Sequence, residues 1–337
     1  MVILLPVTLC ISVSVGAALI PLRETFAVLC GFEAESRHVL IIREIRLPQA
    51  LAAILAGAGL AISGATMQGV LRNPLCSPIT LGISHAAAFG AALVLYFMKG
   101  SVSLANNKTI FGLESPLAGQ GLISLGGFFF AMLATGTLLL LARKQGTRSE
   151  SMILIGVALN SLFAAGLMFL QYLADESQLT AIVYWTFGDT ARAQWNSLLL
   201  MALCVLPISA YFISRSWHYN ALVFGEETAL GLGVPVQRLR VWTMFFSSLL
   251  AAVLVSLLGV IGFVGLVVPH LSRLIIGSDN RFLLPFSFLF GGVLLLVADT
   301  SARLLLAPRM LPVSILTAFI GVPIFLSLLL GQRRIHE

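Results

Sequence analysis

Charged residues are scarce in this sequence. Of its 337 residues, 10% are Asp, Glu, Lys or Arg, whereas 58% are hydrophobic. Soluble globular domains carry about a quarter of charged residues. A soluble fold has no way to hide this much apolar surface, so lipid must surround much of the chain. We therefore expect an all-α, polytopic membrane protein that forms one domain over residues 1–337.

Lysine is especially rare. The chain has only Lys99, Lys108 and Lys144, and none of them stands in the GxxxxGK[ST] pattern that cradles ATP phosphates. If ATP drives this protein, another subunit must bind it, so we expect no cofactor on this chain. The HExxH pattern of zinc enzymes is also absent. We predict no catalytic residue, no metal ligand and no enzyme activity.

Cysteine is too sparse for a disulfide framework. Cys10, Cys30, Cys76 and Cys204 form no CxxC pair, which argues against a disulfide scaffold and a zinc site. The net charge of +6 comes without any long basic run. Basic residues that flank membrane helices explain this charge better than nucleic-acid binding does.

The apolar segments are long and run from end to end of the chain. A helix needs about 20 apolar residues to cross the hydrocarbon layer. About ten candidate spans follow, near residues 2–20, 48–70, 78–98, 119–142, 152–173, 194–213, 241–261, 265–276, 284–304 and 312–330. The eighth is short and contains Pro269, which predicts a half-helix or a helix buried in protein.

An even number of spans places both termini on one side of the membrane. The closing basic residues Arg333 and Arg334 predict that this side is the cytoplasm. Basic residues divide almost evenly between the two sides on this topology, so the arginines predicted outside need their own explanation.

Small residues recur every four positions on two of the predicted helices. Such stripes allow helix backbones to approach closely in lipid, and we favour packing over a pore lining. One stripe is Gly57, Ala61, Ala65 and Gly69, and the other is Gly82, Ala86 and Gly90.

The longest polar stretch of the apolar chain covers about residues 214–240. Its glycines and Pro235 predict two short helices with a turn between them. Acidic residues and glycines are mixed there with Leu230, Leu232 and Val234, which we expect to be exposed. This mixture favours a docking surface for a soluble partner over a plain solvated loop.

Other classes of function find less support. Asp299 is the only acidic residue deep in a predicted span, and it precedes Arg303 by four positions, which favours a local salt bridge over a proton relay. An ion-coupled secondary transporter nevertheless remains the alternative. Ser84 and His85 are adjacent on a helix and point about 100° apart, so a serine-protease pair is disfavoured.

Six motifs in order resemble the permeases that import iron–siderophore, haem and vitamin B12 in the type II class of ABC importers. Arg46-Leu47-Pro48 resembles the RLPR motif of that family, with Gln49 in place of its second arginine. The other five are Gly64–Gly69 with Arg72-Asn73-Pro74-Leu75, then Gly225–Pro235, Gly262–His270, Ala298-Asp299 with Arg303, and finally Leu311-Pro312-Val313 with Gly321-Val322-Pro323.

The resemblance implies a ten-helix permease in a bacterial or archaeal inner membrane. It implies a homodimer that binds two ATPase subunits on its cytoplasmic face and a substrate-binding protein outside. ATPase coupling would fall on Gly225, Glu226, Glu227, Thr228, Ala229, Leu230, Gly231, Leu232, Gly233, Val234 and Pro235.

The same resemblance assigns two further sites. Arg46 and Arg303 would grip acidic residues of the binding protein, although Gln49 weakens this expectation and shifts weight to Arg43 or Arg46. Asn73 and Leu75 would belong to the cytoplasmic gate. The implied cargo is a metal chelate, most often iron–siderophore, with haem, cobalamin and oxyanions such as molybdate or tungstate left open.

Overall fold

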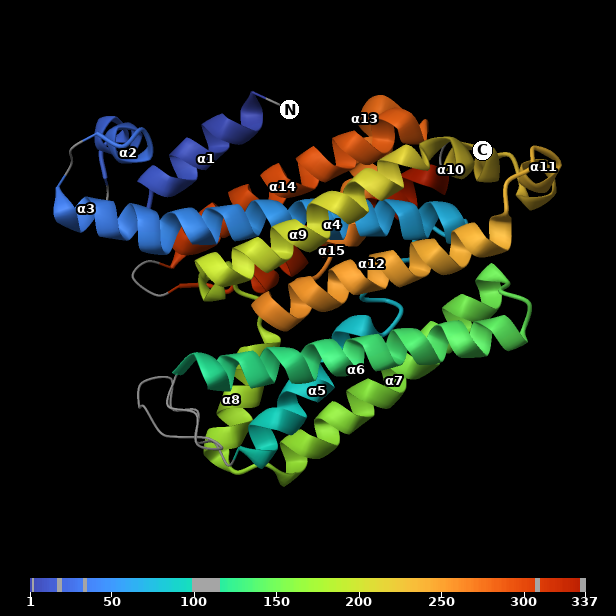
Figure 1. Ribbon diagram of the computed structural model, residues 1–337, viewed down its shortest axis with the longest axis horizontal. Coiled ribbons are helices and arrows are strands. Elements are labelled where there is room, and N and C mark those ends of the chain that lie inside the picture. Colours follow the sequence, from blue (N-terminus) through green and yellow to red (C-terminus); the bar gives the residue numbers. More distant parts are fainter. Residues whose placement is uncertain (2, 17–19, 33–34, 99–115, 307–309, 334–337) are drawn as a thin grey trace. The chain divides into compact units, whose positions relative to one another are not determined.

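The computed structural model describes residues 1–337 with the exception of 2, 17–19, 33–34, 99–115, 307–309 and 334–337. The described chain is helical, apart from one isolated bridge between Phe187 and Val260 (Figure 1). The all-α prediction is confirmed. Lys99, Lys108 and Arg334 lie outside the described residues.

The chain divides into two compact units. The first unit holds residues 1–65, 189–220 and 261–337, and the second unit holds residues 66–188 and 221–260. The division falls within two helices, α4 (Leu47–Leu71) and α10 (Ser216–Val223). The assignment of the whole chain to one permease domain stays a prediction.

The first unit contains most of the segments near the two ends of the chain. Besides the first part of α4, it consists of α1 (Leu4–Ser14), α2 (Leu22–Leu29), α3 (Ser36–Leu40), the π-helix η1 (Ile41–Arg46), the 3₁₀ helix η2 (Thr190–Arg192), α9 (Trp195–Ser214), α13 (Val264–Ile276), α14 (Asn280–Leu305) and α15 (Val313–Arg333). Within this unit α14 packs against α1, α9, α13 and α15.

The second unit is built around α5, which packs against α6, α7, α8 and α12. Its helices are α5 (Ile83–Phe97), α6 (Pro116–Lys144), α7 (Ser149–Leu173), α8 (Glu176–Thr186), α11 (Glu226–Gly231) and α12 (Val236–Leu258). The sequence analysis missed α8. Its signal is a capping box, in which the Asp175 carboxylate accepts from the Gln178 backbone N–H and the Gln178 side chain accepts from the Asp175 backbone N–H.

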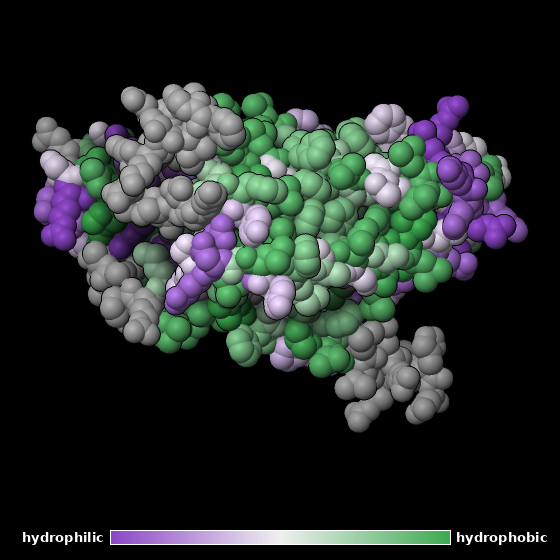
Figure 2. Space-filling model, turned by 90° about the horizontal axis from the view of Figure 1, so that it is seen from below, coloured by the Kyte–Doolittle hydropathy of each residue, from purple (hydrophilic) through white to green (hydrophobic). Residues whose placement is uncertain are grey.

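Six helices among the described residues are long and apolar enough to cross a membrane. They cover Ser36–Leu71, Gly119–Lys144, Ser149–Leu173, Trp195–Ser214, Val236–Leu258 and Asn280–Leu305. Four shorter apolar helices cover Leu4–Ser14, Ile83–Phe97, Val264–Ile276 and Val313–Ser327. Each of the ten predicted segments overlaps one of these helices. Hydrophobic residues make up most of the face drawn in Figure 2. How many helices cross the membrane stays a prediction.

The helix α13 is short, as predicted. It has 13 residues and begins after Phe263, whose backbone lies in the left-handed region with φ 65°. It ends at Gly277, where φ is 84°, a conformation that glycine adopts without strain. Pro269 lies inside the helix, and most of its side chains are buried, which is where broken helices are tolerated in membranes.

Glycines bring α4 into backbone contact with two helices of the first unit. A Cβ atom added at Gly57 would lie 2.2 Å from the carbonyl oxygen of Gly291 on α14. One added at Gly64 would lie 1.7 Å from the carbonyl oxygen of Gly265 on α13. The packing role predicted for the stripe is therefore confirmed at Gly57, whereas Gly69, at its far end, has nothing within 4 Å of such an atom.

We expect Gly64→Ala to destabilise the protein, because the added methyl group would overlap the Gly265 backbone and force α4 and α13 apart. Overpacking of this kind costs about 1–3 kcal/mol. Thermal unfolding of the detergent-solubilised chain measures it. Gly69→Ala is the matched control, since its methyl group meets open space and alanine favours the helix. Equal melting temperatures for the two variants would contradict the close contact.

Candidate functional site

The polar segment folds into two short helices, α10 and α11, as predicted. Gly225 precedes α11 with φ 117°, and Gly233 follows it with φ 80°. Both backbones lie where side chains other than glycine are strained, so these two positions set the turns. The segment then enters α12 through Pro235, which suits the start of a helix.

Large apolar side chains project from this segment into solvent. Leu230 is 55% exposed and Leu232 is 67% exposed, with Val223 and Phe224 exposed beside them. The prediction of exposure is wrong for Val234, which is buried with Ala229. Val234 and Ala229 hold α11 against its own unit, which leaves Leu230 and Leu232 free for a partner.

A buried arginine, Arg240 on α12, connects α11 to two other parts of the second unit. Its guanidinium is 1% exposed and lies 3.1 Å from Oε2 of Glu226. It also donates to the carbonyl oxygen of Thr147 at 2.5 Å and to that of Val70 at 3.4 Å. One side chain thus joins α11, the turn between α6 and α7, and the last turn of α4.

The loop after α4 contains the two predicted gate residues. Arg72 adopts a left-handed backbone with φ 51°, and the chain then turns sharply at Asn73 and Pro74. The Asn73 side chain accepts a hydrogen bond from the Leu75 backbone N–H at 2.9 Å, which is an Asx turn. Leu75 is exposed, and Cys76 behind it is buried, which raises the pKa of its thiol to about 12.

The sequence analysis missed Arg240 because nothing local distinguishes it. It follows Glu226 by fourteen residues, outside the i,i+4 spacing at which helical ion pairs are readable. The available signal is the pair of basic residues, Arg238 and Arg240, at the start of a long apolar helix, because a charge that becomes buried there must find a partner.

On the first unit, Asn220 ties α10 to the start of α14. Its side-chain N–H donates to Asp279 Oδ1 at 2.7 Å, and its carbonyl oxygen accepts from the Asn280 backbone N–H at 2.7 Å. Hydrogen bonds from Arg281 and then Asn220 hold the pKa of the Asp279 carboxyl well below its usual value. Asn220 therefore fixes α10 to the start of the long apolar helix α14.

The arginines predicted to dock the binding protein, Arg46 and Arg303, are buried in the first unit. Arg46 donates from Nη1 to the carbonyl oxygens of Val13 and Ser14 at 2.9 and 2.8 Å. Arg303 donates from Nη2 to the carbonyl oxygen of Ser12 at 3.2 Å. These carbonyls belong to the last turn of α1, where carbonyl groups lack partners within the helix. The Ser14 carbonyl also accepts from the Ile20 backbone N–H at 3.3 Å.

Asp299 completes this cluster. Its Oδ2 atom lies 3.1 Å from Nε of Arg303, so the predicted i,i+4 pair is confirmed, although these two atoms lack hydrogen-bond geometry. Its Oδ1 atom accepts hydrogen bonds from Gln49 Nε2 at 3.0 Å and from the Thr190 hydroxyl. Gln49, which replaces the arginine of the related motif, thus serves as a donor inside the cluster.

Arg46 is 5% exposed and Arg303 is 8% exposed. A residue that grips another protein must be accessible, so their geometry suits an anchor for α1, and their docking role stays a prediction. Arg43, one turn before Arg46, is exposed. Within the described part of the chain, no three His, Cys, Asp or Glu residues come together as a metal site.

Comparisons with known proteins agree over nearly the whole chain. The hemin transport system permease protein HmuU of Yersinia pestis is 39% identical over 290 residues, which cover 86% of this chain and 83% of that protein. The molybdate import system permease protein MolB of Haemophilus influenzae is 35% identical over 337 residues, covering 98% and 94%.

A solved inward-facing structure assigned to the metal-chelate type of ABC transporter superposes with a TM-score of 0.82. It is 34% identical, and the match covers 98% of this chain and 97% of that one. The family model described as the FecCD transport family matches residues 4–331. This chain, with its apolar helices, its short α13 and its exposed α10–α11 segment, therefore belongs to the FecCD transport family of ABC transporter permeases.

Proposed function

We propose that this chain is the membrane permease of an importer for a metal chelate, with an iron–siderophore complex as cargo. The observation that carries the proposal is the family match over residues 4–331, together with the metal-chelate type assigned to the structural neighbour. Related permeases are named for hemin and for molybdate, so haem, cobalamin and oxyanions such as tungstate are competing cargoes. The ligand of the cognate binding protein distinguishes them.

The proposed assembly is a homodimer in an inner membrane with both termini in the cytoplasm. Two ATPase subunits would bind residues 225–235, and the exposed Leu230 and Leu232 support this assignment. The chain itself binds no ATP in this proposal. A substrate-binding protein would dock outside and would select the cargo, which is why the permease needs no tight site of its own.

Arg240 offers a path by which movement of α11 could reach the proposed gate loop. A force on α11 reaches Glu226 and passes through the buried guanidinium to the carbonyl of Val70, three residues before Asn73. Movement of α11 would therefore be transmitted to the loop with Asn73 and Leu75, the proposed cytoplasmic gate.

No described feature favours the ion-coupled alternative. Asp299 is the one acidic residue that is buried among the described residues. Arg303 lies beside one of its carboxylate oxygens, and Gln49 and Thr190 donate hydrogen bonds to the other. A carboxylate held in this way stabilises local structure. A proton carrier would need exchange with a water-filled path.

The function is tested by replacing Leu230 with Arg. Vesicles that contain the permease, its ATPase and its binding protein should import ferric siderophore only with ATP, and Leu230→Arg should weaken ATPase binding by roughly tenfold or more. Leu22→Arg on α2 is the matched control, since Leu22 is as exposed as Leu230. Uptake driven by an ion gradient without ATP would overturn the proposal.

The Arg240 route is tested by a double-mutant cycle with Glu226→Gln and Arg240→Gln. Residues in direct contact typically show interaction energies of about 0.5–3 kcal/mol, so the effects on stability should not add. The rate of ATP hydrolysis that is stimulated by loaded binding protein is measured in parallel. Additive effects on this rate, or a rate that Arg240→Gln leaves unchanged, would remove Arg240 from the route.

Variants of Arg43 and Arg46 separate docking of the binding protein from anchoring of α1. Arg43→Glu should weaken binding-protein affinity, most strongly at low salt, because exposed charges are screened within about 10 Å at 0.1 M salt. Arg46→Gln should lower thermal stability, because it removes the guanidinium that donates to the buried carbonyls of Val13 and Ser14. A salt-dependent affinity loss in Arg46→Gln with unchanged stability would restore Arg46 as the docking residue.

A further inference from the structure

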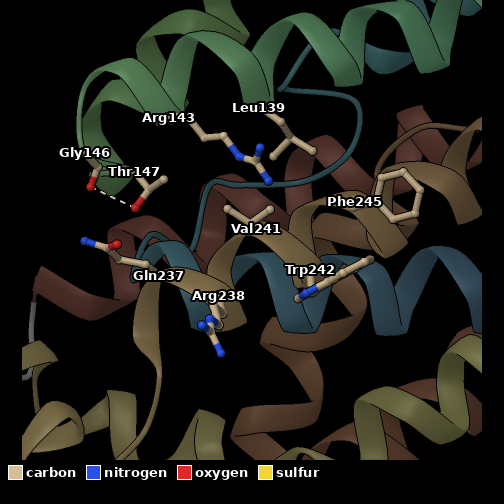
Figure 3. A pocket seen from close by; sticks show the side chains of 9 residues that line it. All are labelled: Leu139, Arg143, Gly146, Thr147, Gln237, Arg238, Val241, Trp242 and Phe245. Carbon is tan, nitrogen blue, oxygen red and sulfur yellow. Dashed lines mark hydrogen bonds between the residues drawn. The ribbon is translucent and has the colours of Figure 1, made fainter.

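A cavity of about 480 Å³ lies between α6 and α12 in the second unit (Figure 3). Its walls combine apolar and basic side chains. Nine residues line it: Leu139, Arg143, Gly146, Thr147, Gln237, Arg238, Val241, Trp242 and Phe245. None of these nine residues belongs to residues 225–235, to the loop with Asn73 and Leu75, or to the first-unit cluster of Arg46, Arg303 and Asp299, so the roles proposed above do not account for this cavity.

The two arginines of the cavity pair with no acidic side chain that the structure describes. Arg143 reaches from α6 toward α12, and Arg238 lies on the first turns of α12 (Figure 3). Neither takes part in an ion pair or a side-chain hydrogen bond with another residue that the structure describes. No carboxylate lines the cavity. Its charge is therefore positive and uncompensated.

The cavity lies at the ends of two apolar helices, and the ends of membrane-spanning helices are where hydrocarbon gives way to headgroups. Arg143 lies in the last turn of α6, and Arg238 lies near the start of α12; both helices are long and apolar enough to cross a membrane. Trp242 is 51% exposed on the cavity wall, and tryptophan is enriched at the headgroup level. Leu139, Val241 and Phe245 supply the apolar side that an acyl chain requires.

Arg240 fixes one wall of the cavity. Gly146 and Thr147 have left-handed backbones with φ 75° and 55°, and the buried guanidinium holds the carbonyl of Thr147. The Thr147 hydroxyl bonds to the carbonyl of Gly146 at 2.8 Å. These hydrogen bonds hold the turn between α6 and α7, and a preformed site binds with less ordering cost.

We propose that this cavity binds the phosphate of one anionic phospholipid from the leaflet at which α6 ends and α12 begins. The guanidinium groups of Arg143 and Arg238 would bind the phosphate oxygens, since arginine donates in a fork that fits them. The glycerol region would lie against Gln237 and Trp242. Basic pockets between membrane helices are a recognised type of headgroup site.

The experiment titrates the full chain, in neutral detergent, with phosphatidylglycerol and counts bound lipid by native mass spectrometry. The variants are Arg143→Gln with Arg238→Gln, and Arg148→Gln as the matched control. Arg148 is an exposed arginine near the same turn that does not line the cavity. Phosphatidylcholine of the same acyl chains and free glycerol 3-phosphate serve as parallel probes. Thermal unfolding checks that every variant is folded.

We expect one phosphatidylglycerol site that the double variant weakens by roughly thirtyfold, because it removes two basic residues at a charged surface. Arg148→Gln should keep wild-type affinity, and phosphatidylcholine should bind more weakly than phosphatidylglycerol. Equal phosphatidylglycerol binding by all variants would overturn the proposal. Equally tight binding of free glycerol 3-phosphate would overturn it in favour of a soluble anion. Weaker ATPase binding with unchanged lipid binding would overturn it in favour of a protein interface.

Discussion

Arginine bound to helix-end carbonyls is the interaction on which both units depend. The last turn of a helix leaves carbonyl oxygens without backbone partners, and lipid offers none. Arg46 and Arg303 serve the end of α1 in the first unit. Arg240 serves the last turn of α4 in the second unit. Each guanidinium supplies several donors in a fixed plane, which lysine does not, and this suits a chain with only three lysines.

These anchors have different consequences in the two units. In the first unit, Asp299 lies beside Arg303, and Gln49 and Thr190 complete its hydrogen bonds. That cluster is closed and holds α1 to α14. In the second unit, the partner of Arg240 is Glu226 on the half-exposed helix α11. The same kind of anchor is therefore enclosed in one unit and bound to a half-exposed helix in the other.

Local signals in the sequence were sufficient to predict the long apolar helices and insufficient to predict the short helices between them. The ten predicted apolar segments each overlap an observed apolar helix, because a long run of apolar residues is a strong local signal. The glycines around α11 were readable for the same reason, since a left-handed backbone is a local requirement. The short helices α2, α3 and α8 were missed, because amphipathic segments of five to eleven residues resemble loops in composition.

The sequence alone was enough to predict a chain of membrane helices, without an ATP-binding GxxxxGK[ST] motif, in which residues 225–235 form a separate polar element. Composition and spacing carry that information locally. Only the tertiary structure decided what the individual arginines do. Arg46 and Arg303 are buried against α1, Arg240 joins three segments, and Arg143 and Arg238 face a cavity. Burial and partners depend on residues that are distant in sequence, so five arginines of the same chemistry acquired different roles only through packing.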